Sequence, residues 1–135
     1  MKNIPHVSKY MSTSPHSVGA DQSLQVASEL MAKHKIRHLP VLEGGKLTGL
    51  LSDRDVKLYL SFTGVDIKKQ NAGEVADREV YTVSPEALLD EVTGHMAERK
   101  LGSAVVMDNK KVVGIFTSVD AMRALAELLS TKLKK

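Results

Sequence analysis

Two stretches of the sequence place a glycine, a hydroxyl residue and an aspartate at the same spacing. They run from Gly49 to Asp55 and from Gly114 to Asp120, with Ser52 and Thr117 at the hydroxyl position. A glycine within a strand lets a neighbouring backbone or a ligand approach closely, because it has no Cβ. A hydroxyl residue at a helix N-cap lies beside free backbone N–H groups, a place that favours phosphate. The aspartate offers two acceptor oxygens to the hydroxyls of a ribose, so the pattern indicates a ribose-phosphate site.

An ordinary helix start explains the same residue types. Ser52 and Thr117 are good N-caps, and an aspartate in the first turn complements the helix dipole without any ligand. Both stretches nevertheless follow an apolar strand that contains the glycine. Because the whole pattern recurs, the binding interpretation gains weight over the capping one.

The two stretches belong to a longer internal duplication. Residues 24–56 align with residues 89–121 without a gap, and a Ser-Pro at 14–15 recurs at 84–85, slightly out of that register. Self-similarity of this kind predicts two copies of one supersecondary unit. Two copies packed together form symmetric clefts, and clefts between repeats are natural ligand sites.

Each copy is expected to contain a strand, a helix, two strands and a second helix. In the first copy we expect an extended segment at residues 10–15, a helix at 24–35, strands at 38–42 and 47–51, and a helix at 52–61. In the second copy we expect an extended segment at 79–84, a helix from 85, strands at 104–107 and 112–116, and a last helix after 117. A copy of about 60 residues has too little core to stand alone, so the two should pack together.

Local chemistry predicts how these helices begin and which faces they bury. Ser23 or Asp21 is placed to cap the first helix, Pro85 suits the first turn of the third helix, and residues 16–22 are expected to form a loop. We expect Met31 and Met96 in the core. In the last helix we expect a buried stripe made of Val119, Met122, Leu125, Ala126 and Leu129.

Composition narrows the class of protein. The chain has 135 residues, of which 42% are hydrophobic and 26% charged, as in an ordinary soluble domain. It has no cysteine, which excludes disulfides, thiolate nucleophiles and cysteine-ligated zinc. No apolar run approaches the roughly 20 residues of a membrane span, and the start lacks the apolar stretch of a secretory signal. We therefore expect a cytoplasmic protein with no membrane partner.

The net charge of +3 does not point to nucleic acid. Three of the 19 basic residues are Lys132, Lys134 and Lys135, and without them the 16 acidic residues balance the rest. These lysines are expected to continue the last helix, where they suit the negative end of its dipole. With two Phe, three Tyr and no Trp, the chain has little aromatic surface for base stacking.

The order and spacing of these features resemble a pair of CBS domains, which together form a Bateman module. The stretch from Met31 to Leu42, continued by Gly49 to Val56, is especially typical of stand-alone prokaryotic members. The resemblance covers Val7 to about Leu129 and implies an α+β fold of two tandem βαββα repeats related by a pseudo-twofold axis. It places the repeats at residues 7–61 and 72–129, a linker at 62–71 and a basic C-terminal tail at 130–135.

The resemblance implies a regulatory sensor rather than a catalyst. CBS pairs commonly dimerise and bind adenosine-containing ligands such as AMP, ADP, ATP or S-adenosylmethionine in the clefts between repeats. We therefore expect an adenine nucleotide as the regulatory ligand, no other cofactor, a homodimer, and a regulated protein partner whose identity the sequence does not give.

The family's binding residues map onto both repeats. The motif aspartate holds the ribose hydroxyls, which assigns that role to Asp55 and Asp120, and the motif hydroxyls of Ser52 and Thr117 lie near ribose or phosphate. The adenine is held largely by backbone at two places in each repeat. These places are Thr13, Ser14, Pro15, Ile36, His38 and Pro40 in the first repeat, and Thr82, Val83, Ser84, Leu101, Ser103 and Val105 in the second.

The two copies differ in charge where a phosphate would lie. The first has Arg37, His38 and Arg54 where the second has, in the same order, Gly102, Ser103 and Val119. Guanidinium groups suit bidentate contacts with phosphate, so Arg37, His38 and Arg54 are the phosphate-binding candidates. The alternative is that they are solvent-facing residues at a helix-to-strand corner. One cleft is then expected to bind more tightly than its twin, and the sequence leaves open which aspartate shares a cleft with Arg37.

Other functions remain as alternatives or are not expected. The main alternative is a dimerisation or protein-interaction module without a physiological small ligand. We expect no enzyme, because the chain lacks a cysteine nucleophile, a convincing general-base pair and a Walker-type loop. We expect no metal site: His34 and His38 have i,i+4 spacing, but the helix should end between them and no third ligand is near.

Overall fold

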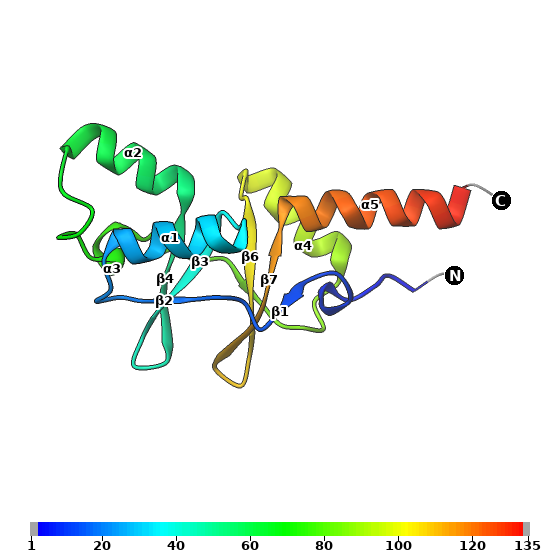
Figure 1. Ribbon diagram of the computed structural model, residues 1–135. Coiled ribbons are helices and arrows are strands. Elements are labelled where there is room, and N and C mark those ends of the chain that lie inside the picture. The colour runs from blue at the N-terminus through cyan, green and yellow to red at the C-terminus, as the bar shows by residue number, and fades with distance from the viewer. Residues whose placement is uncertain (1–2, 134–135) are drawn as a thin grey trace. The chain divides into compact units, whose positions relative to one another are not determined.

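The computed structural model describes residues 3–133, and these fold as two compact units (Figure 1). The central unit is formed by Pro15–Val80. The terminal unit combines the residues up to Ser14 with those from Tyr81 onward. The chain therefore starts in the terminal unit, continues through the whole central unit and then completes the terminal unit. As a result, the opening segment of the first repeat packs with the elements of the second.

The central unit contains a three-stranded sheet and three helices. Its elements are β2(Val18–Gly19), α1(Leu24–His34), β3(His38–Glu43), β4(Lys46–Ser52), α2(Asp53–Thr63) and α3(Ala72–Val75). The strand order is β2-β3-β4, in which β3 and β4 form an antiparallel hairpin and β2 runs parallel to β3. The hairpin turns through Gly44 and Gly45, whose φ angles of 58° and 81° suit glycine.

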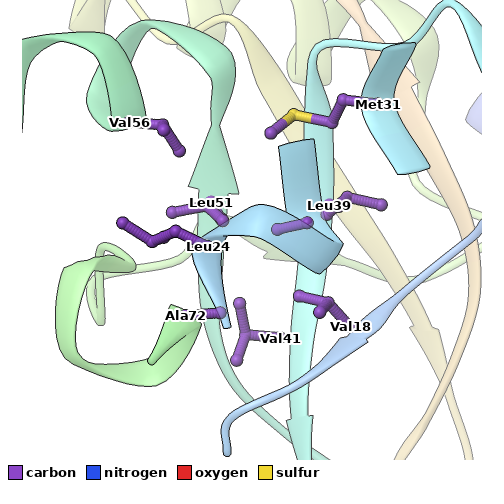
Figure 2. Packing of buried hydrophobic residues seen from close by; sticks show 9 residues of the cluster. Val18, Leu24, Met31, Leu39, Val41, Leu51, Val56 and Ala72 are labelled. Atoms are coloured by element: carbon purple, nitrogen blue, oxygen red, sulfur yellow. The ribbon is translucent and has the colours of Figure 1, made fainter. Parts of the chain in front are cut away.

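The helix α1 shows why this unit folds as its sequence predicts. The Ser23 side chain caps it by accepting a hydrogen bond from the Val26 N–H at 3.2 Å, as one of the two predicted caps should. The helix ends at Lys35, which adopts a left-handed conformation with φ 54°. Its buried face packs into a core made of Val18, Leu24, Ala27, Met31, Leu39, Val41, Leu51, Val56 and Ala72 (Figure 2).

The terminal unit repeats this arrangement around a four-stranded sheet. Its elements are the 3-10 helix η1(Val7–Lys9), β1(Ser12–Thr13), β5(Thr82–Val83), α4(Leu89–Arg99), β6(Ser103–Asp108), β7(Lys111–Thr117) and α5(Ser118–Leu133). The order is β1-β7-β6-β5, with β5 parallel to β6 and the other pairs antiparallel. Phe116 is fully buried in its core, and Met96 is 4% exposed there, as predicted.

The two copies agree in local detail. The helices α1 and α4 both end at a left-handed lysine, with φ 54° at Lys35 and 56° at Lys100. The two hairpins carry the same register shift, between Val41 and Leu42 and between Val106 and Met107. The predicted mixed α+β fold of two duplicated units is confirmed.

The motif glycines make room for backbone. A Cβ on Gly49 would lie 3.1 Å from the Asp77 carbonyl oxygen, and one on Gly114 would lie 3.0 Å from the Ser12 carbonyl oxygen. Both distances are tighter than ordinary contacts, because Leu50 bridges to Asp77 in the central unit and β1 pairs with β7 in the terminal unit. Of the two roles expected for these glycines, the close approach of a neighbouring backbone is the one seen.

Two local predictions were wrong. The expected loop at residues 16–22 contains β2, because Val18 and Gly19 pair with β3. Pro85 does not start a helix, and α4 begins only at Leu89. The carbonyl of Pro85 instead accepts a hydrogen bond from the Ser8 N–H at 3.2 Å, so this segment is held by η1. The residues next to Pro85 in the sequence do not predict this contact.

The buried face of α5 was also predicted wrongly. Met122 is 62% exposed and Leu125 is 57% exposed, and Val119, Ala126 and Leu129 are exposed as well. The helix instead packs through Ala124, supported by Ala121 and Leu128. It carries apolar residues on two faces, and the smaller side chains take the core. Lys134 and Lys135 of the predicted basic tail lie outside the described residues, and no helix within residues 3–133 is long and apolar enough to cross a membrane.

Candidate functional site

A cavity of about 580 Å³ opens in the central unit, where β3 begins and β4 leads into α2. Seven residues line it: Arg37, His38, Ser52, Asp53, Arg54, Lys57 and Leu58. All four ribose-phosphate candidates of the first repeat are among them, namely Ser52, Arg37, His38 and Arg54. The structure therefore brings these predicted residues together, while their contact with a ligand stays a prediction.

Backbone pairing holds the walls of this cavity in place. His38 at the start of β3 lies opposite Ser52 at the end of β4. The Asp53 N–H donates a hydrogen bond to the Arg37 carbonyl at 2.9 Å, which ties the entry to β3 to the first turn of α2. The Ser52 hydroxyl caps α2 by accepting from the Asp55 N–H at 3.0 Å. These bonds fix where the neighbouring side chains emerge.

The cavity is lined by cations. Within residues 3–133, neither the Arg37 nor the Arg54 guanidinium lies within ion-pair distance of a carboxylate. The Lys57 Nζ lies 3.0 Å from the Asp53 Oδ2, but this pair is exposed and such pairs are weak. The first turn of α2 adds the positive end of a helix dipole. Two unpaired guanidinium groups beside a helix start suit an anion with several oxygens, such as phosphate.

Asp55 lies next to the cavity rather than in its lining. It is half-buried, and among the described residues its carboxylate accepts no hydrogen bond. Its charge acts on His38: burial lowers the pKa of His38, the Asp55 carboxylate partly offsets this, and Arg37 lowers the pKa further. His38 is therefore neutral near pH 7 and has a carboxylate and a guanidinium in its surroundings.

The counterpart in the terminal unit is arranged differently. Asp120 is only 6% exposed, and both of its carboxylate oxygens are used. Its Oδ2 accepts from the Thr117 N–H at 2.9 Å and from the Thr117 hydroxyl at 3.1 Å, while its Oδ1 accepts from the Arg123 Nη1 at 3.1 Å. The Thr117 hydroxyl also caps α5 by accepting from the Asp120 N–H at 3.3 Å. Thr117 thus holds the helix start and the aspartate side chain at once.

The predicted adenine-binding residues are divided between the units. Thr13 and Ser14 end the first segment of the terminal unit, whereas Pro15, Ile36 and Pro40 belong to the central unit. Thr82 and Val83 form β5, followed by Ser84. Ser103 and Val105 lie in β6, and Leu101 lies two residues before it. Several of these backbone N–H groups already form hydrogen bonds within the chain. Those of Ile36, Leu101 and Val105 donate, in that order, to the carbonyl oxygens of Met31, Met96 and Tyr81. Apart from His38, none of the adenine set lines the cavity. The assignment of the adenine residues stays a prediction.

The sequence analysis did not identify Lys57 as a residue of the cavity, and it did not predict that His34 stacks on His16. Lys57 follows Arg54 by three positions, so both side chains emerge on one face of α2, a spacing that could have been read. His34 ends α1 and stacks on His16, with ring centroids 3.6 Å apart, rather than pairing with His38.

Comparison with known proteins decides the family. The family model described as "CBS domain" matches residues 7–61 and again residues 72–127. The chain belongs to the CBS domain family. Its two matches in tandem make it a CBS pair with the architecture of a Bateman module, and CBS pairs are regulatory modules.

Relatives of this CBS pair include stand-alone proteins of similar length. Hypoxic response protein 1 of Mycobacterium tuberculosis is 32% identical over 82% of this chain and 78% of its own. A protein assigned to acetoin utilization in Vibrio cholerae has a crystal structure that matches with a TM-score of 0.87, 28% identity and 98% coverage of both chains. The CBS domain pair of protein MJ0100 matches with a TM-score of 0.84, 28% identity and coverage of 93% of this chain and 98% of its own. That structure is a complex with 5′-methylthioadenosine and S-adenosylmethionine.

Proposed function

We propose that this CBS pair is a non-catalytic regulatory module whose ligand is an adenine nucleotide: AMP, ADP or ATP. The observation that carries the proposal is the cavity at the start of α2, which gathers Arg37, His38, Arg54 and Lys57 around Ser52. The adenosine-containing ligands of the MJ0100 pair support an adenosine moiety. The cations of this chain support a phosphorylated one.

Each residue has a distinct task in this proposal. The guanidinium groups of Arg37 and Arg54 bind phosphate oxygens, and the Ser52 hydroxyl lies beside them at the helix start. The carboxylate of Asp55 receives the ribose hydroxyls, since no residue of the described chain occupies it. Bound nucleotide stabilises one conformation over another only through contacts that differ between the two, and a regulated partner protein reads the difference.

Isothermal titration of the purified chain tests the proposal. AMP, ADP, ATP, NAD and S-adenosylmethionine are titrated separately, with adenosine as a control that lacks phosphate. We expect binding of at least one adenine phosphate in the micromolar range and weaker binding of adenosine. Absence of heat with every nucleotide, at protein concentrations that detect micromolar binding, would overturn the proposal.

Nucleotide binding should depend on pH through His38. Burial lowers its pKa, so the free protein carries it neutral at pH 7, and a phosphate placed beside it raises that pKa again. Binding then takes up a proton, and the affinity for ADP should rise roughly threefold to tenfold between pH 8 and pH 6.5. His38→Gln should remove most of this rise, which separates it from protonation of the phosphate itself. If the affinity rises equally in wild type and in His38→Gln, the proposed contact between His38 and the phosphate is contradicted.

A second candidate function is association with another copy of the chain, and the exposed face of α5 favours it. Met122 and Leu125 are more than half exposed, and they border an apolar cavity of about 410 Å³ that also contains Ile4 and Leu128. Water-exposed apolar surface of this kind is covered when two copies associate. We therefore propose a homodimer that buries this face.

Sedimentation equilibrium tests the homodimer. Wild type should sediment as a dimer, and Leu125→Glu should shift it to monomer, because a charge would be buried at the interface. Ser130→Glu, also on α5 and exposed, serves as the matched control and should leave the dimer intact. A monomeric wild type at tens of micromolar would rule the homodimer out.

A further inference from the structure

We infer that each chain binds one nucleotide, through Asp55 alone, and that the ligand is selected for a negatively charged tail. The inference rests on the proposed function and deepens it. It starts from a difference between two aspartates at equivalent positions of the duplication. One carboxylate is open to a ligand, and the other is engaged by Thr117 and Arg123 around the start of α5.

Both carboxylate oxygens of Asp120 already accept hydrogen bonds from the chain itself. A ribose diol needs both carboxylate oxygens as acceptors, one for each hydroxyl. The Oδ2 of Asp120 already accepts two hydrogen bonds from Thr117, at 2.9 Å and 3.1 Å, and its Oδ1 accepts one from Arg123. Asp120 is only 6% exposed within this arrangement. A ribose that uses both oxygens would have to compete with the Arg123 guanidinium of α5 and with Thr117 at the end of β7.

Asp55 has the same backbone setting but an unoccupied carboxylate. Its N–H donates to the Ser52 hydroxyl at 3.0 Å, just as the Asp120 N–H donates to Thr117. No side chain in residues 3–133 donates to the Asp55 carboxylate. Ser52 does not donate to it as Thr117 does to Asp120, and the residue three positions further on also differs. The first copy has Leu58 where the second has Arg123, so no guanidinium reaches back across the helix turn.

The surrounding charges separate the two aspartates further. Arg37, Arg54 and Lys57 line the cavity beside Asp55. The duplication puts Gly102, Val119 and Met122 at the corresponding positions near Asp120. These three positions are therefore uncharged near Asp120, where the Arg123 guanidinium is already paired with the Asp120 carboxylate. The cations beside Asp55 oppose the sulfonium and amino groups of S-adenosylmethionine, so this chain should prefer nucleoside 5′-phosphates over it.

Exchange of the two distinguishing residues tests the inference. Leu58→Arg should bring a guanidinium onto Asp55 at i,i+3 and lower the affinity for ATP at least tenfold. Arg123→Leu, its mirror in the other copy, should leave the affinity for ATP at Asp55 unchanged, because Arg123 does not line that cavity. Circular dichroism melting of both variants shows that they fold, and Leu58→Gln controls for loss of the leucine.

The outcomes distinguish this inference from the function on which it depends. Wild type that binds no nucleotide would overturn the proposed function. Wild type that binds two nucleotides per chain with similar affinity would leave that function intact and overturn the inequality of the aspartates. So would Leu58→Arg with unchanged affinity, or S-adenosylmethionine that binds as tightly as ATP.

Discussion

Replacing both Arg37 and Arg54 by glutamine is expected to weaken ATP binding by about a hundredfold or more. Each guanidinium can make charge-assisted hydrogen bonds to phosphate, and such bonds are worth roughly 1.5–3 kcal/mol apiece. Solvent screening of these exposed side chains places the loss for each at the lower end of that range, which gives about 3 kcal/mol for the pair and roughly a hundredfold in affinity. Isothermal titration of ATP into the double variant at fixed salt concentration measures it.

The same titration has a matched control within the central unit. Arg78 is an exposed arginine that does not line the cavity, so Arg78→Gln removes a positive charge without touching the site. It should change the affinity by no more than about twofold, through the general field alone. If Arg78→Gln and the double variant weaken binding equally, the cations of the cavity act through net charge and not through contact.

Truncation of Phe116 to alanine should lower the free energy of unfolding by about 3–5 kcal/mol. Its side chain is completely buried in the core of the terminal unit, where it packs with Val7, Leu89, Val106 and Ala124. Removing the ring leaves a cavity that the surrounding strands and helices fill only in part. Urea denaturation followed by circular dichroism measures the change in midpoint and slope.

The other phenylalanine provides the control for this truncation. Phe62 is 82% exposed near the end of α2, so Phe62→Ala deletes a phenyl ring that already lies in solvent. It should change the free energy of unfolding by less than about 0.5 kcal/mol. A Phe116→Ala variant no less stable than Phe62→Ala would contradict the core described for the terminal unit.

The fold could be predicted well from the sequence because both copies of the duplication contain the same helix caps and turn residues, which act on their immediate neighbours. Ser23 caps α1, the glycine-rich turn closes the first hairpin, and Thr117 caps α5, all as the residue types indicate. Such features depend on neighbours a few residues away. They were therefore accessible without knowledge of the tertiary structure.

The features that escaped prediction depend on contacts far along the chain. The strand β2 exists only because β3 lies beside it, and Pro85 is held by the segment around Ser8. Packing in the core determines which of the two apolar faces of α5 is buried: Ala124 lies in the core, whereas Leu125 is exposed to solvent. A helical period identifies apolar faces, but it does not say which one is covered.

The candidate site was predicted in part for the same reason. Arg37, His38, Ser52 and Arg54 follow from two short motifs whose ends the hairpin brings together, and the cavity contains all four. The symmetry that suggested two equal aspartates hid their difference. Arg123 stands three residues after Asp120, at the spacing of a helical ion pair, and its absence after Asp55 was visible in the sequence.

The central claim is that an adenine nucleotide binds at the cavity where β3 and α2 begin. Titration of ¹⁵N-labelled protein with ADP, followed by two-dimensional NMR of the backbone amides, tests it residue by residue. The account predicts that the largest shifts occur at Arg37, His38 and residues 52–57. Saturable shifts that leave these amides unmoved, or no shifts at millimolar ADP, would contradict it.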